Sequence, residues 1–190
     1  QELLLGEDLC GHVNRKGGRV PARAALELLL PAIDGVAHAH DRGIVHRDLK
    51  PENIFLARTD DGVVPKVLDF GISKVKTGNL RTTVTGSVFG TPGYMPPEQV
   101  RSFADADARA DVWALGVLVY ECLAGRRPFV GRGLGGMLRD VLRPPPPLRD
   151  LAPGAPPPLL DLVGRALSTD RAARPSMAEI AAILRAHPFG

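Results

Sequence analysis

The sequence predicts an α+β fold that is mainly α-helical, with one small β-hairpin, and three observations support this prediction. Apolar residues recur at steps of three and four before residue 41, an apolar stretch covers residues 111–124, and short apolar runs flank a turn at residues 60–62. Steps of three and four indicate one face of a helix, whereas short runs around Asp and Gly indicate a hairpin. The chain has 190 residues, 44% hydrophobic and 24% charged, which suits a globular unit and excludes a disordered one.

The first long helix is expected from about Pro21 to His40. Its buried face consists of residues at helical spacing: Leu26, Leu29, Ile33, Val36 and His40. Pro31 lies inside this stretch, and a proline there removes one backbone hydrogen bond, so a kink is expected unless packing absorbs it. His38 and His40 could suggest a metal pair, but no acid completes a ligand set, so His40 is interpreted as a core or surface histidine.

Three short apolar runs are interpreted as strands, at residues 44–45, 54–56 and 66–68, with Asp60-Asp61-Gly62 as the turn between the last two. Residues 111–124 are apolar on every side, which predicts a central buried helix that ends at Gly125. Two more helices are expected at about 158–167 and 176–186. The proline-rich segment 144–158 is expected to be a stiff, extended connector, and an SH3-type ligand is the less favoured alternative.

Several function classes receive little support from the sequence. The net charge is only +3 and the basic residues are scattered among acidic ones, so no nucleic-acid partner is expected. Cys10 and Cys122 are far apart and form no CxxC motif, which suits a reducing compartment and predicts no metal site from cysteine. The longest apolar stretch, residues 112–123, is too short to span a bilayer, so no membrane contact is expected from this segment.

The residues with chemical potential gather in the loop His46-Arg47-Asp48-Leu49-Lys50-Pro51-Glu52-Asn53. Asp48 could accept a hydroxyl proton, Lys50 could neutralise charge on a transferred phosphoryl group, and Asn53 could hold a metal ion through its amide oxygen. Asp69-Phe70-Gly71 follows the last predicted strand, where Asp69 could bind the same metal and Gly71 would free the backbone to turn.

Taken together and in this order, residues 46–53 and 69–71 resemble the catalytic half of the protein kinase family. The resemblance implies a catalytic loop at 46–53 and an activation segment at 69–98, whose end reads Pro-Pro-Glu where the family has Ala-Pro-Glu. It also implies three structural roles. Glu98 would pair with Arg174, Asp111 would hold the backbone of the catalytic loop, and His46 would pack under Phe70.

The same loop resembles serine/threonine kinases, because Lys50 stands two positions after Asp48 and Thr91 would bridge these two residues. Aminoglycoside phosphotransferases share a His-x-Asp loop but lack a segment like residues 90–98. The bias toward arginine, alanine and proline is similar to that of GC-rich bacterial genes. The chain therefore resembles the C-terminal lobe of a eukaryotic-like (Hanks-type) bacterial serine/threonine kinase. The resemblance implies that ATP and Mg²⁺ are its cofactors.

Residues 1–9 resemble the hinge between the two kinase lobes, and residues 10–190 resemble the large lobe. The resemblance implies that backbone groups of Glu2 and Leu4 meet adenine, that Asp8 reaches the ribose and that Phe55 forms the adenine floor. No Gly-x-Gly-x-x-Gly motif occurs, so the N-terminal lobe is expected to be absent. The glycine-rich residues 131–136 are interpreted as a loop before a surface helix, not as a phosphate cradle.

Two functions remain open at this point. Either the chain is the catalytic lobe of a complete kinase, or it is a kinase-like binding or scaffold module. The first is favoured because every catalytic-loop position keeps a functional side chain and because the chain begins at glutamine without an initiating methionine. The fragment alone is expected to be inactive, since half of the nucleotide pocket would be missing.

The resemblance also implies regulation and partners. Arg47 would bind a phosphate on the activation segment, with Thr83 and Thr85 as the first candidates for modification. The partner would be a protein substrate with a Ser or Thr acceptor, and a dimer could serve trans-autophosphorylation. The expected location is the cytoplasm, where the chain could also be the cytoplasmic domain of a membrane-anchored kinase.

Overall fold

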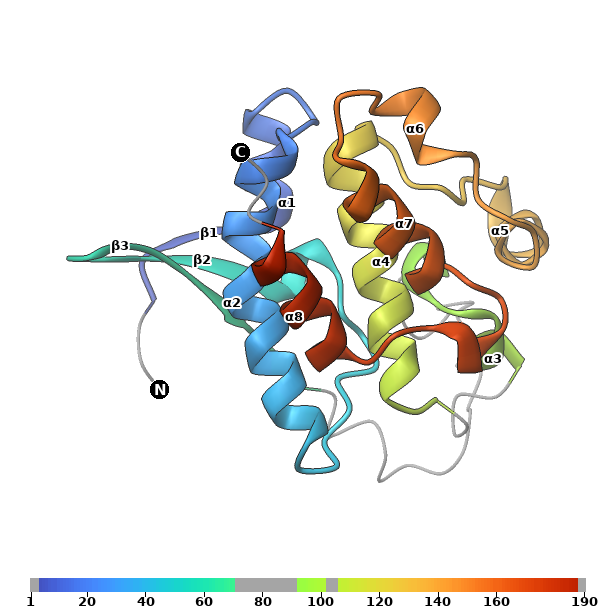
Figure 1. The fold of residues 1–190 in the computed structure, drawn as a ribbon, viewed down its shortest axis with the longest axis horizontal. Coiled ribbons are helices and arrows are strands. Elements are labelled where there is room, and N and C mark those ends of the chain that lie inside the picture. The colour runs from blue at the N-terminus through green and yellow to red at the C-terminus, as the bar shows by residue number, and fades with distance from the viewer. Residues whose placement is uncertain (1–3, 71–91, 102–105, 188–190) are drawn as a thin grey trace.

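The computed structural model describes residues 4–70, 92–101 and 106–187. Helices dominate the described part, and a small sheet lies at one side of them (Figure 1). The elements in chain order are β1 (Gly6–Asp8), α1 (Leu9–Arg15), α2 (Ala22–His40), η1 (Pro51–Asn53), β2 (Ile54–Thr59), β3 (Gly62–Val67), η2 (Pro92–Tyr94), α3 (Pro97–Arg101), α4 (Ala108–Ala124), α5 (Gly133–Val141), α6 (Leu148–Leu151), α7 (Pro157–Ala166), η4 (Arg171–Ala173) and α8 (Met177–Ala186). This arrangement confirms the predicted α+β, mainly helical fold.

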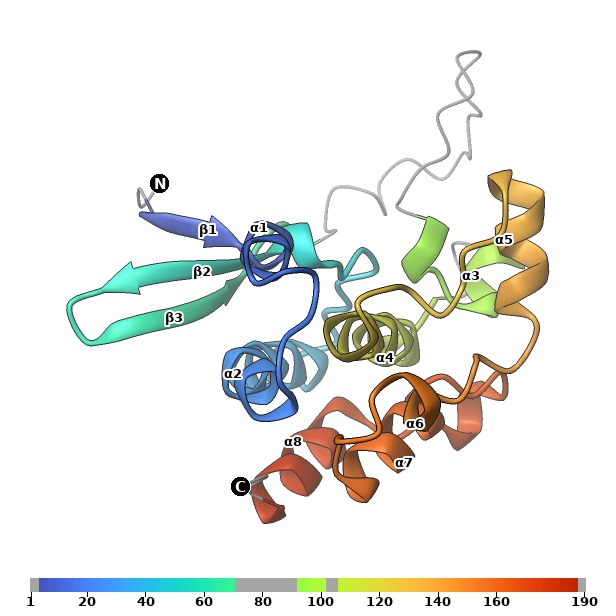
Figure 2. The same ribbon diagram turned by 90° about the horizontal axis from the view of Figure 1, so that it is seen from above.

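Helix α4 forms the centre of the core, as the sequence predicts. Seen from above, it lies between the sheet with α1 on one side and α3 with α5 on the other (Figure 2). Its side chains from Ala110 to Tyr120 are all buried. The helix begins earlier than predicted because Asp107 accepts a hydrogen bond from the backbone N–H of Arg109, 2.8 Å, and so caps the N-terminus. It ends at Gly125, whose φ of 72° lies in the left-handed region that favours glycine.

Helix α2 runs through Pro31 without interruption and matches the predicted helix to within one residue. Pro31 is on the exposed side, where the helix can tolerate the lost hydrogen bond more easily. The opposite side packs into the core and against α8, which crosses α2 in Figure 1. Helices α7 and α8 also form within one residue of their predicted starts, and α8 begins with a capping box between Ser176 and Glu179.

The sheet has the order β1-β2-β3 and is antiparallel throughout. The hairpin β2–β3 turns at residues 60–61, as predicted, but residues 44–45 are not a strand. Gly43 has a φ of 72° and lets the backbone N–H of Ile44 bond the carbonyl of Ala39 at 2.9 Å, which closes the end of α2. Strand β1 was not predicted, since residues 6–8 were assigned to a hinge.

Two loop predictions are wrong in part. The segment 144–158 is not one extended connector, because it contains α6 and because Pro157 opens α7. Proline is tolerated in the first turn of a helix, where its missing N–H would have no partner. Residues 133–136 belong to helix α5 and not to a loop. An added Cβ at Gly131 would lie 2.2 Å from the carbonyl carbon of Gly136, so this close backbone contact requires glycine.

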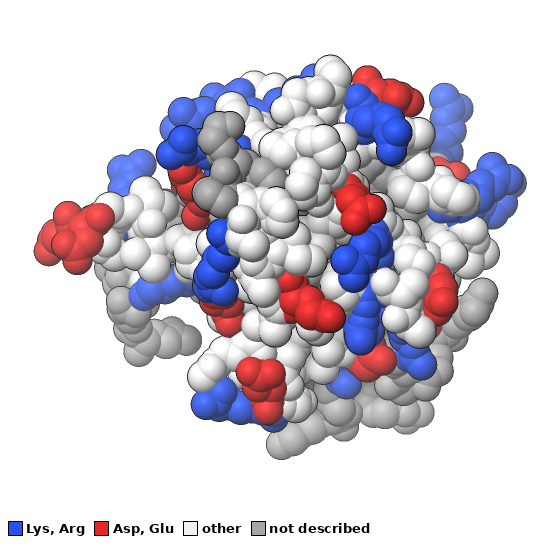
Figure 3. All heavy atoms as spheres, viewed as in Figure 1, with Lys and Arg blue, Asp and Glu red and all other residues white. Residues whose placement is uncertain are grey.

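Lysine and arginine are interspersed with aspartate and glutamate on the face shown in Figure 3.

Within the described ranges, no helix combines the length and apolar character needed to cross a membrane.

Candidate active site

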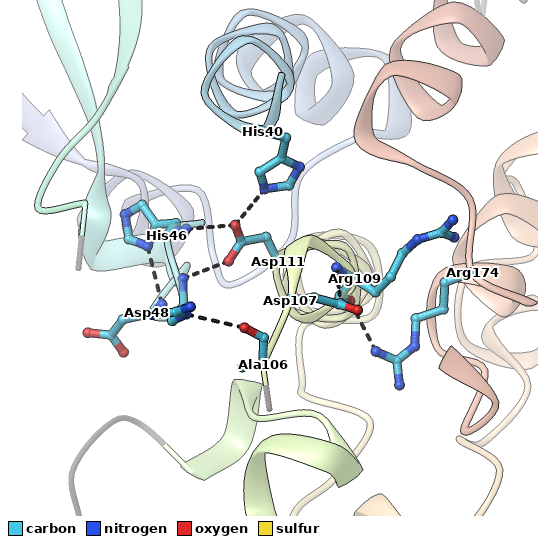
Figure 4. Close-up of polar contacts among 9 residues, drawn as sticks. His40, His46, Asp48, Ala106, Asp107, Arg109, Asp111 and Arg174 are labelled. Atoms are coloured by element: carbon cyan, nitrogen blue, oxygen red, sulfur yellow. Dashed lines mark hydrogen bonds and ion pairs between the residues drawn. The ribbon is translucent and has the colours of Figure 1, made fainter. Parts of the chain in front are cut away.

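Asp111 fixes the start of the predicted catalytic loop to helix α4. Its side chain is buried on the first turn of α4, and both carboxylate oxygens accept hydrogen bonds (Figure 4). The backbone N–H of His46 donates to Oδ2 at 2.8 Å, and that of Arg47 donates to Oδ1 at 2.8 Å. The ring of His40 donates from Nε2 to Oδ2 at 2.7 Å. The expected contact of Asp111 with the loop backbone is thus present, and His40 supports it.

His46 connects this loop to the residues that follow β3. The backbone N–H of Asp48 lies 3.3 Å from Nδ1 of His46, which must accept, so the ring carries its proton on Nε2. That Nε2 donates to the carbonyl of Leu68 at 2.8 Å. The ring also packs against Phe70, with centroids 4.9 Å apart, as the family resemblance implies. The loop and the Asp69-Phe70 segment are therefore held together at their backbones.

Asn53 makes the second connection between the two segments. Its side-chain Nδ2 donates to the carbonyl of Asp48 at 2.8 Å, and its own carbonyl accepts from the N–H of Leu68 at 2.8 Å. Leu68 is thus held through both its backbone groups, directly before Asp69. Nζ of Lys50 lies 3.4 Å from Oδ2 of Asp48. The structure brings Asp48, Lys50, Asn53 and Asp69 to one part of the molecule.

Arg47 and Asp69 have unusual backbone conformations. Their φ angles are 65° and 53°, and among the described residues they are the non-glycine positions with positive φ. Each such position costs roughly 1–3 kcal/mol and persists where the surroundings over-determine it, which is common at functional sites. One precedes Asp48 and the other is a predicted metal ligand, so strain is concentrated at the candidate site.

The residues present fit a magnesium ion. The amide nitrogen of Asn53 donates to the carbonyl of Asp48, so its Oδ1 is the atom that could bind the ion, and Asp69 is an exposed residue. Among the described residues there is no group of three or more His, Cys, Asp or Glu side chains that could hold a metal alone. An amide oxygen and a carboxylate are oxygen ligands of the kind that Mg²⁺ prefers, and Mg²⁺ is usually bound by one or two carboxylates together with substrate phosphates and water.

Arg174 holds the end of the predicted activation segment, at Glu98. Arg174 is buried and donates to both oxygens of Glu98, at 2.6 and 2.9 Å, so the expected pair is present and bidentate. The guanidinium of Arg174 also lies over the ring of Trp113, 4.9 Å from its centroid. Trp113 stacks on Phe129, which agrees with its predicted packing role.

Tyr94 ties η2 to α4. Its hydroxyl donates to the carboxylate of Glu121, and Arg127 lies over the ring at 5.9 Å. Burial, followed by the hydrogen bond to Glu121, raises the pKa of Tyr94 far above its usual value, so the phenol remains a donor at every physiological pH. Tyr120, predicted as a packing residue, is buried and donates to the carbonyl of Pro146 at 3.1 Å.

The predicted nucleotide residues lie at β1 and β2. Asp8 and Phe55 face each other in the antiparallel register, and Leu4 is half-buried just before β1. Asp8 also caps α1, because its Oδ1 accepts from the N–H of Gly11 at 2.7 Å. The sequence carried a signal for this role, since an aspartate before an apolar run is a typical N-cap. Glu2 lies outside the described residues.

Other predicted residues also lie outside them: Gly71, Thr83, Thr85 and Thr91. The side chain of Arg47, the predicted phosphate ligand, donates from Nε to the carbonyl of Ala106 at 3.3 Å. Sequence reasoning missed two residues that support the loop. His40, which bonds Asp111, was interpreted as a core or surface histidine although its place on the buried stripe of α2 was recognised. Gln99, whose Nε2 donates to the carbonyl of Arg47 at 2.9 Å, had no local signal.

Comparison with known proteins agrees with this arrangement. Residues 1–189 match the protein kinase domain family. The chain belongs to that family. It is 44% identical to the serine/threonine-protein kinase Pkn1 of Myxococcus xanthus over 170 residues, which are 88% of this chain and 24% of Pkn1. It is 41% identical to the serine/threonine-protein kinase PknA of Mycobacterium tuberculosis over 163 residues, 85% of this chain and 36% of PknA.

A solved structure of Rad53, residues 1–466, in complex with AMP-PNP has a similar fold, with a TM-score of 0.75 and 29% identity. The match covers 95% of this chain and 44% of that one. The chain thus spans between about a quarter and a half of the length of these three proteins. Its relatives confirm the predicted resemblance to bacterial serine/threonine kinases.

Proposed function

We propose that this chain is the catalytic lobe of a larger kinase that transfers the γ-phosphoryl group of ATP to Ser and Thr hydroxyls of proteins. The observation that carries the proposal is the double attachment of Leu68, whose N–H bonds Asn53 and whose carbonyl bonds His46. This attachment holds Asp69 beside the loop that contains Asp48. Phosphoryl transfer needs this kind of positioning more than covalent chemistry.

Each residue receives one role in the proposal. Asp48 accepts the proton of the acceptor hydroxyl and orients it for attack. Lys50, whose Nζ lies 3.4 Å from Oδ2 of Asp48, stabilises the charge of the transferring phosphoryl group. Asn53 and Asp69 would hold Mg²⁺, which when bound neutralises charge on the nucleotide phosphates. The AMP-PNP in the Rad53 structure supports ATP as the nucleotide.

A transfer assay on the full-length protein tests the proposal. With radiolabelled ATP, Mg²⁺ and a generic protein acceptor, label is expected on Ser and Thr, as read by phosphoamino-acid analysis. Asp48→Asn should reduce kcat by roughly 10²- to 10⁴-fold, because the amide cannot accept the proton. Asp60→Asn, at the exposed hairpin turn, is the matched control and should transfer like the wild type.

Two results would contradict the proposal. Nucleotide binding without any transfer by the wild-type protein would favour the kinase-like binding module instead. Equal transfer by the wild type and by Asp48→Asn would remove Asp48 from the base role.

A further inference from the structure

Gln99 is a buried polar side chain that the proposed mechanism leaves unused. It lies on the short helix α3 with 6% of its surface exposed. Its Nε2 donates to the backbone carbonyl of Arg47 at 2.9 Å, across 52 residues of sequence. Buried amides are retained where their hydrogen bonds are satisfied, so this contact determines where the side chain points. The neighbouring Glu98 points elsewhere, toward Arg174.

The carbonyl that Gln99 binds belongs to the peptide group that joins Arg47 to Asp48. The conformation of Arg47 is left-handed, with a φ of 65°, and such a conformation persists only where the surroundings hold it. Asp111 holds the N–H side of Arg47, and Gln99 holds the carbonyl side. The orientation of the peptide plane before Asp48 therefore depends on two side chains from two different helices.

We propose that Gln99 is a positioning residue for Asp48. The inference rests on the proposed function, in which Asp48 is the base. His46 and Asn53, which also bond the Asp48 backbone, lie in the same loop as Asp48. Gln99 comes from α3, directly after the predicted activation segment 69–98. The amide of Gln99 thus makes the orientation of Asp48 depend on the position of α3.

Hydrogen exchange on the full-length protein tests the contact without requiring activity. Gln99→Met keeps the length of the side chain but removes the donor. Exchange of backbone amides in residues 46–53 is expected to accelerate roughly three- to tenfold, the effect of about one lost hydrogen bond, while exchange in α7 and α8 remains unchanged. Gln99→Glu keeps the shape of glutamine and loses the donor when ionised, so it serves if the methionine variant folds poorly.

Glu98→Gln is the matched comparison, because it weakens the other long-range bond of α3 and leaves the amide of Gln99 in place. It is expected to lower the melting midpoint without accelerating exchange in residues 46–53. Unchanged exchange in Gln99→Met would overturn the proposal. So would equal acceleration in both variants, because the effect would then belong to α3 as a whole.

Steady-state kinetics separates positioning from a merely structural role. Gln99→Met is expected to lower kcat roughly three- to tenfold while the KM for ATP stays within twofold of the wild-type value. A loss that appears only in KM, or no loss in kcat, would overturn the role. If the wild-type protein transfers no phosphate, the proposed function fails, and the exchange measurement still decides whether Gln99 holds the loop.

Discussion

Asp111 lies on the first turn of α4, and its carboxylate accepts hydrogen bonds from the backbones of His46 and Arg47 and from the ring of His40. Hydrogen bonds to an ionised acceptor are roughly twice as strong as neutral ones, and burial keeps water from competing for them. Because Asp48 follows Arg47 directly, the position of the proposed base is set from the central helix and not by its own loop alone.

Asp111→Asn is expected to loosen this arrangement. An amide offers one acceptor oxygen where the carboxylate offers two, so at least one buried donor loses its partner. The free energy of unfolding should fall by about 1–3 kcal/mol, measured by urea denaturation. Asp34→Asn is the control: Asp34 forms an exposed pair with Arg185, and such pairs are worth about 0–1 kcal/mol. Equal losses in the two variants would contradict the role of Asp111.

The helices show which elements the sequence could predict. The apolar pattern placed α2, α7 and α8 within one residue of their starts, because burial of one face is a local property of the sequence. Strand β1 could not be predicted this way. Its three residues form a strand because β2, about fifty residues later, supplies the hydrogen-bonding partner, as in the pair Gly6 and Ala57. The first turn of α5 and helix α6 were not predicted, because the glycines of residues 131–136 and the prolines of residues 144–158 indicated loops.

Gly125 and Gly164 provide a paired test at the scale of the helix. At Gly125 the φ of 72° suits glycine, and an added Cβ would lie 2.8 Å from Cγ of Arg19, so Gly125→Ala should lower the free energy of unfolding by about 1–2 kcal/mol. Gly164 lies inside α7 with nothing within 4 Å of an added Cβ. Gly164→Ala should therefore raise the free energy of unfolding by about 0.5–1 kcal/mol. Chemical denaturation measures both, and effects of the same sign would refute the argument.

At the scale of the whole molecule, the candidate site depends on contacts between distant parts of the chain. The order of Asp48, Asn53 and Asp69 along the sequence was enough to predict that they share one site, and the structure brings them to one part of the molecule. The contacts that hold them were not all predictable, since His40 reaches Asp111 across 71 residues and no local pattern pairs them. The pair of Glu98 and Arg174, 76 residues apart, was predictable only through the family resemblance.

The pair of Arg174 and Glu98 allows a prediction about the stability of the entire fold. Arg174 has a side chain with no exposed surface, and besides Glu98 it donates to the carbonyls of Ser168 and Arg109. Arg174→Met leaves the carboxylate of Glu98 uncompensated, which should lower the free energy of unfolding by about 3–5 kcal/mol. Adding Glu98→Gln should recover part of the loss, because no charge is then left unpaired. Recovery is not complete, since the two carbonyls still lack their donor.

Denaturation of both single variants and the double variant measures this coupling as a double-mutant cycle. Arg185→Met, which breaks the exposed pair with Asp34, is the matched control and should lower the free energy of unfolding by no more than about 1 kcal/mol. If the effects at Arg174 and Glu98 simply add, the two side chains do not stabilise each other. The ion pair would then contribute no net free energy to holding the end of the predicted activation segment against the helical core.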